Sequence, residues 1–102
     1  MIPLKAMPGL VFTEPLMSLL EKGRSLYDQQ KFEQAKTVFQ EAVRLKSRSG
    51  EARYWLGLTN YEIGDDKEAS KQLRISVRYE RKNPNAHLAL GRTYMRMKNR
   101  MV

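Results

Sequence analysis

Several residue types on which common enzymes and secreted domains depend are missing or nearly missing from this sequence. There is no cysteine, which excludes disulfide bridges, thiolate zinc sites and cysteine nucleophiles. The single histidine, His87, gives a histidine metal cluster or a Ser-His-Asp triad very little to build on. No apolar run approaches the ~18 residues that a membrane-spanning helix needs, which excludes an integral membrane protein.

Acidic residues are scarce relative to basic ones. The 102 residues include 19 Lys and Arg against 11 Asp and Glu, a formal net charge of +8. This balance favours binding of something acidic over catalysis. The sequence also has no phosphate-binding glycine-rich loop, no HExxH motif and no nucleophile beside a base. We therefore expect a chain that is not an enzyme and that uses no small-molecule substrate, no cofactor and no metal.

Residues 1–14 are expected to form an irregular apolar leader. Pro3, Pro8 and Gly9 interrupt its apolar stretch, whereas a secretory signal needs ~7–15 uninterrupted apolar residues and a small-residue cleavage site. The segment therefore does not read as a signal peptide, and we expect a cytoplasmic protein. Its apolar side chains suggest that the leader docks on another surface.

A period of 34 residues organises the rest of the chain. Gly23, Gly57 and Gly91 are spaced by 34 and 34. A coincident series on one period is the sequence signature of a repeat architecture. The same spacing separates further pairs: Ala35 and Ala69, Ala52 and Ala86, Leu56 and Leu90, Tyr27 and Tyr61, Thr59 and Thr93, and Val43 and Val77.

Within each period the apolar residues recur three and four positions apart, as on one face of an α-helix. Asn83 followed by Pro84, and Asp65 three residues before Glu68, are typical of helix starts. The pattern predicts five helices, and the short connections make neighbouring helices antiparallel. The expected ranges are 15–28, 32–46, 50–62, 66–81 and 84–98.

These residues resemble the tetratricopeptide repeat (TPR) family, whose unit is a 34-residue helix-turn-helix. The Leu-Gly pair of the family pattern occurs twice, and small residues flank a large apolar residue in the second helix of both units, with serine in place of one alanine in the second unit. Arg53 and His87 depart from the pattern, because they stand where the family often has tryptophan. The residues that carry the resemblance are Leu56-Gly57, Leu90-Gly91, Ala35, Phe39, Ala42, Ala69, Leu73 and Ser76.

The resemblance implies an all-α fold, a right-handed superhelix of antiparallel helix pairs with about five helices in two and a half repeats. The units would be 15–49, 50–83 and 84–102, the last being the first helix of a third unit or a capping helix. Gly23, Gly57 and Gly91 would lie where a partner helix passes closely, since glycine inside a helix costs about 1 kcal/mol relative to alanine. His87 is expected to fill a packing position.

In this family the first helix of each unit lines a concave groove. The resemblance therefore implies a protein–protein interaction module or scaffold that binds a peptide, helix or partner protein there. Arg24 and Arg92 would orient the ligand, and apolar and aromatic side chains would supply burial, although any one of these side chains can instead pack on an adjacent helix. The expected groove residues are Leu20, Arg24, Tyr27, Tyr54, Leu58, Tyr61, Leu88, Arg92 and Met95.

Two alternatives stay open. A basic stripe follows one face of the fourth predicted helix at Lys67, Lys71, Arg74, Arg78 and Arg81. It indicates either a solvated helix face or electrostatic attachment to nucleic acid or an anionic membrane.

The last predicted helix carries apolar residues on more than one face. A second copy in a self-associating homo-oligomer, a partner, the leader, or further repeats of a longer array would each cover that surface.

Overall fold

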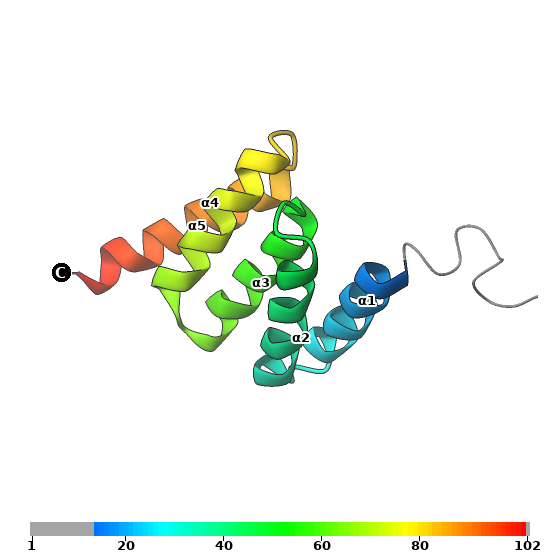
Figure 1. Ribbon diagram of the computed structural model, residues 1–102. Coiled ribbons are helices and arrows are strands. Elements are labelled where there is room, and N and C mark those ends of the chain that lie inside the picture. Colours follow the sequence, from blue (N-terminus) through cyan, green and yellow to red (C-terminus); the bar gives the residue numbers. More distant parts are fainter. Residues whose placement is uncertain (1–13, 102) are drawn as a thin grey trace, which may run out of the picture.

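The computed structural model describes residues 14–101, and within them it shows five α-helices and no strand (Figure 1). The all-α prediction is confirmed, and each predicted helix boundary lies within two residues of the observed one. The predicted leader lies outside the described residues apart from Glu14. The helices are α1 (Glu14–Asp28), α2 (Phe32–Leu45), α3 (Gly50–Ile63), α4 (Asp66–Tyr79) and α5 (Pro84–Arg100).

Side-chain caps explain where three of the helices begin. Ser49 accepts a hydrogen bond from the Ala52 amide at 3.1 Å before α3, and Asp65 accepts one from the Glu68 amide at 3.1 Å before α4. Asn83 does the same for the first turn of α5, with proline following it. These caps satisfy amide donors that have no partner within their own helix.

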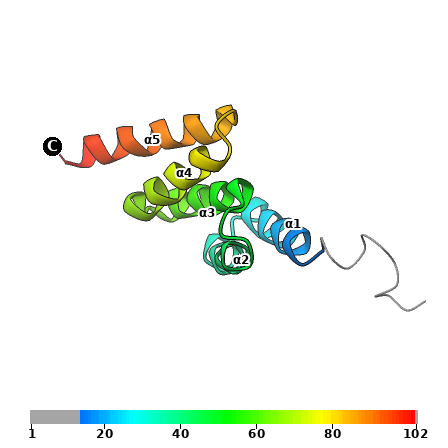
Figure 2. The ribbon, with the colours of Figure 1, turned by 45° about the horizontal axis from the view of Figure 1, so that its top comes forward.

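The helices stack in chain order, so each one packs mainly on its sequence neighbours (Figure 2). α5 lies at one end of this stack, and α4 and α3 pack on it from one side. Short connections make this order inevitable. The sharp turn from α3 to α4 uses Gly64, whose φ of 99° is a left-handed conformation that glycine adopts readily.

Close helix crossings account for two of the three repeated glycines. A Cβ atom on Gly23 would lie 2.4 Å from Phe39 Cε1, and one on Gly57 would lie 2.6 Å from Leu73 Cγ. The expectation is wrong for Gly91, where a Cβ would meet nothing within 4 Å. The reason is that none of the described residues places a helix against that side of α5.

The core follows the small and large positions of the repeat. Phe39 and Leu73 are fully buried, and alanines surround them at the helix crossings. Ser76 is also buried and donates a hydrogen bond from Oγ to the carbonyl oxygen of Gly50 at 2.8 Å. This bond ties α4 to the start of α3, and it satisfies two polar groups that the packing removes from water.

Candidate functional site: a groove across three helices

Four of the expected groove residues lie around one pocket. Tyr27 comes from α1, Leu58 and Tyr61 from α3, and Arg92 from α5. Glu62 and Ala89 complete the lining, and the pocket has a volume of about 230 Å³. Residues that are 31 to 65 positions apart along the chain thus meet at one place, which the stacking of α1, α3 and α5 makes possible.

Tyr27 is held in this pocket by contacts on several sides. Its ring packs edge-on against Phe32 and Trp55, with centroid distances of 5.2 and 5.5 Å. The hydroxyl donates a hydrogen bond to Glu62 Oε1 at 3.5 Å. Burial, together with the negative charge of Glu62, raises the pKa of Tyr27 to about 12. The phenol is therefore neutral at physiological pH and available as a fixed aromatic wall.

Trp55 organises the aromatic cluster beside the groove, although it is not among the groove residues expected from the sequence. Phe39 stacks on its ring at a centroid distance of 6.0 Å, and Tyr54 meets it edge-on at 5.4 Å. The guanidinium of Arg24 lies over the same ring, 5.1 Å from the centroid. The sequence gives one signal for this role: Trp55 lies two positions after Arg53, which stands where the resemblance expects a tryptophan.

The remaining expected groove residues are divided between the core and α5. Leu20 is only 7% exposed and belongs to the core, so it offers almost no surface to a ligand. Leu88 and Met95 are exposed and line a second, larger hollow of about 710 Å³ along α5. Tyr61 and Arg92 line both hollows, which makes them the connection between the two surfaces.

A comparison with protein families agrees with the helical repeat architecture. A family model described as tetratricopeptide repeat matches residues 20–74, more than half of the chain. The chain belongs to the tetratricopeptide repeat family. Such repeats are generally protein-interaction modules and typically act as non-enzymatic scaffolds. A comparison with curated proteins finds no match to this TPR chain.

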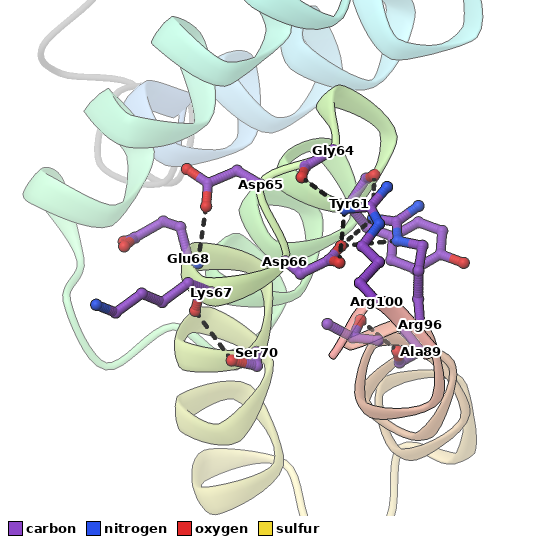
Figure 3. A network of polar contacts seen from close by, with 11 residues as sticks. Tyr61, Gly64, Asp65, Asp66, Lys67, Glu68, Ser70, Ala89, Arg96 and Arg100 are labelled. Carbon is purple, nitrogen blue, oxygen red and sulfur yellow. Dashed lines mark hydrogen bonds and ion pairs between the residues drawn. The ribbon is translucent and has the colours of Figure 1, made fainter. Parts of the chain in front are cut away.

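An ion-pair network anchors the last helix of this TPR stack to α4 (Figure 3). The carboxylate of Asp66, 9% exposed, accepts a hydrogen bond from Arg96 Nε at 2.7 Å and pairs with Arg96 Nη2 as well. Arg100 Nη1 donates to the other carboxylate oxygen at 2.8 Å. Asp66 offsets one of the two positive charges at this helix junction, so part of the basic character of α5 is structural.

The same network fixes one wall of the groove. Arg96 also donates to the carbonyl oxygen of Tyr61 at 2.7 Å, and its guanidinium lies 3.5 Å from the centroid of the Tyr61 ring. Such a cation–π contact holds the ring in one orientation. Local sequence patterns give no sign of this role of Asp66, because its partners are 30 and 34 residues further along the chain.

His87 does not occupy the packing position that the resemblance implies. The side chain is exposed, and its Nε2 lies 2.7 Å from the carbonyl oxygen of Arg81. On the part of the chain that the structure describes, no group of three His, Cys, Asp or Glu side chains is arranged to hold a metal ion. Along the same residues, no helix is both long and apolar enough to cross a membrane.

All five residues of the basic stripe are exposed. Between residues 14 and 101, none of them forms an ion pair with a carboxylate. They lie on α4 and the loop that follows it, whereas the lining of the groove comes from α1, α3 and α5. The protein thus presents two chemically different surfaces, one largely apolar and aromatic with one arginine and one glutamate, the other cationic.

Proposed function

We propose that this TPR chain binds a partner protein by holding a peptide or helix in the groove that α1, α3 and α5 form. The observation that supports this best is the meeting of Tyr27, Leu58, Tyr61 and Arg92 around one pocket. Aromatic and arginine side chains with fixed positions are the residues that contribute most to binding at protein interfaces. Tyr27 meets this condition through several contacts of its side chain, and Tyr61 through the cation–π contact of its ring with Arg96.

The chemistry of the pocket favours one kind of ligand segment. A volume of about 230 Å³ accepts one or two apolar side chains. Arg92 is exposed and pairs with no carboxylate of residues 14–101, so it can bind a carboxylate of the ligand in a bidentate manner. We therefore expect a segment that combines a bulky apolar residue with an acidic one.

A charge reversal in the groove tests this proposal. Peptides selected from a displayed library against the full chain are expected to bind Arg92→Glu at least tenfold more weakly than the wild type. The control is Arg78→Glu, which makes the same charge change at an exposed position of α4, away from the groove. Circular dichroism checks that both variants fold. Equal binding to the wild type and to Arg92→Glu contradicts the proposal.

The basic stripe supports a second candidate, electrostatic attachment to nucleic acid or to an anionic membrane. Its five side chains are exposed and unpaired among the described residues. Neutralisation of phosphates makes affinity fall steeply with salt. Binding to duplex DNA, to RNA or to phosphatidylserine vesicles should therefore weaken strongly as salt rises, and Arg78→Glu should weaken it further. Binding that is insensitive to salt excludes this candidate.

A further inference from the structure

The outer side of α4 carries every basic residue of that helix. The four Lys and Arg residues of α4 follow one another at steps of four, three and four. These steps place them within roughly 60° of one another around the helix axis, on a line roughly 16 Å long from Lys67 to Arg78. Arg81 continues the basic stripe in the turn after the helix. α4 packs on α3 and α5, its neighbours in chain order, and the stripe lies on neither packing side.

The acidic residues within α4 are turned away from the stripe. Asp66 pairs with two arginines of α5, and Figure 3 shows Lys67 pointing away from that network. The carboxylate of Glu68 accepts a hydrogen bond from Nε2 of the buried Gln72 at 2.9 Å. The positive charges of the stripe are therefore not offset by the carboxylates of their own helix.

The repeat architecture does not require such a stripe, as the equivalent helix of the first unit shows. The five positions that precede the stripe by 34 residues hold Glu33, Thr37, Gln40, Arg44 and Ser47. Glu33 lies 3.6 Å from Lys36, and Arg44 pairs with Glu41. The outer side of α2 is thus polar and balanced in charge, which is sufficient for contact with water. The single sign of charge on α4 indicates an anionic partner.

We propose that the basic stripe binds the anionic surface of a lipid bilayer, with α4 parallel to the membrane plane. This inference rests on the electrostatic attachment proposed for the stripe, and it names the partner. Lipids move laterally, so phosphatidylserine head groups can gather beneath each charge, whereas a rigid ligand needs matching spacings. Each Lys or Arg near such a surface raises the affinity by a factor of about five. The exposed residues of α4 include no aliphatic side chain, so the attachment is electrostatic and reversible.

The placement of the charges on one line favours a flat surface over a nucleic acid. Phosphates form both walls of a duplex groove, so a helix in the major groove needs basic residues on both of its flanks. Along Asp66–Tyr79 the flanks carry no Lys or Arg. Single strands bind through aromatic side chains on which the bases stack, and Tyr79 is the one exposed aromatic residue of α4. A flat anionic surface meets all four charges of the helix at once.

Sedimentation with vesicles tests the proposal on the full chain. One preparation is phosphatidylcholine alone, and the other contains one third phosphatidylserine. The wild type should bind only the vesicles with phosphatidylserine. Added salt should release it, because ions screen the attraction between exposed charges.

A matched pair of variants assigns this binding to the stripe. Lys71→Gln removes one charge of the stripe and should weaken binding about fivefold, and the double variant with Arg78→Gln about 25-fold. Lys22→Gln makes the identical change at an exposed position of α1, which has no contact with α4 within residues 14–101, and should leave binding unchanged. Circular dichroism checks that the variants fold, as the similar helix propensities of Lys, Arg and Gln lead us to expect. Equal weakening by Lys71→Gln and Lys22→Gln would mean that net charge attracts the chain, and would overturn the proposal.

Three further outcomes would also overturn it, and they separate its failure from that of the proposed functions. Binding of duplex DNA or RNA that Lys71→Gln weakens, without binding of anionic vesicles, would make nucleic acid the partner and keep the second candidate function. Binding of neither would remove that candidate too, while the groove proposal depends on its own peptide assay. Vesicle binding that disappears on deletion of residues 2–13 and is normal in Lys71→Gln would place the attachment in that segment.

Discussion

Removal of the charge on Asp66 should loosen α5 from the rest of the stack. Asp66→Asn keeps the size of the side chain but replaces an acceptor that bonds both Arg96 and Arg100. The substitution replaces one oxygen of the carboxylate by an NH2 group, and this new donor faces a guanidinium. Arg96 would then remain three-quarters buried with its main counter-charge gone.

The contacts of Asp66 give the size of the expected loss in the free energy of unfolding. A hydrogen bond to a charged group contributes roughly 1.5–3 kcal/mol, and this range applies to the Arg96 contact because that side chain is 25% exposed. The Arg100 side chain is 56% exposed, so its pair adds at most about 1 kcal/mol. Asp66 also opens α4, where a negative charge near the helix N-terminus contributes about 0.3–1 kcal/mol. We expect a loss of about 3 kcal/mol in total.

Urea unfolding followed by circular dichroism and by the fluorescence of Trp55 measures this loss. Glu51→Gln is the matched control, because Glu51 is an exposed acidic residue in the first turn of α3. It should cost no more than the helix-terminus effect of about 0.3–1 kcal/mol. Hydrogen exchange should locate the difference, with faster exchange of α5 amides in Asp66→Asn and unchanged exchange in α1 and α2.

An equal free energy of unfolding for Asp66→Asn and Glu51→Gln would refute this reasoning. A double-mutant cycle with Arg96→Leu provides a second check that does not depend on the absolute loss. The coupling energy between the two positions should exceed about 1 kcal/mol if the pair stabilises the junction. A coupling near zero would mean that α5 is held by apolar packing alone.

Further predictions concern the helix crossings and the groove. Gly57→Ala should destabilise the fold by more than about 1 kcal/mol in thermal unfolding, because the added Cβ would lie 2.6 Å from Leu73 Cγ and outweigh the gain in helix propensity. Ser76→Ala should lose about 1–3 kcal/mol in urea unfolding, since the carbonyl of Gly50 loses its buried donor. The pKa of Tyr27 is raised from 10.0 to about 12, so the stability that its neutral form contributes is complete below pH 10 and is lost as the pH rises toward 12. Between pH 10 and 12, the free energy of unfolding should therefore fall less steeply with pH in Tyr27→Phe than in the wild type. Equal pH dependence in the two proteins would contradict this assignment.

Residues that act through local spacing were predicted well. The caps at Asp65 and Asn83 and the close crossings at Gly23 and Gly57 follow from short-range patterns, and the structure has all four. Gly91 shows the limit of such patterns. It has the same position in the repeat as Gly23 and Gly57. Whether another helix packs against it depends on the tertiary structure, which the 34-residue spacing does not show.

Contacts between distant residues could not be predicted in the same way. The cluster around Trp55 and the ion pairs of Asp66 depend on how far each helix is rotated and on which side chains it presents to the next helix. A periodic pattern defines an apolar stripe roughly 100° wide on the helix, so it does not separate Leu20, which is buried, from Tyr27, which lines the groove.

The amino-acid sequence by itself determined that this is an all-α repeat protein with five helices, because hydrophobic periodicity, caps and the 34-residue spacing are local and redundant. Only the tertiary structure decided which arginines pair with Asp66, which aromatic residues meet at the groove, and which side of α5 is bare. The physical reason is that burial and pairing of a side chain depend on atoms that lie on other helices, far away along the chain. Such contacts exist only once the helices are stacked.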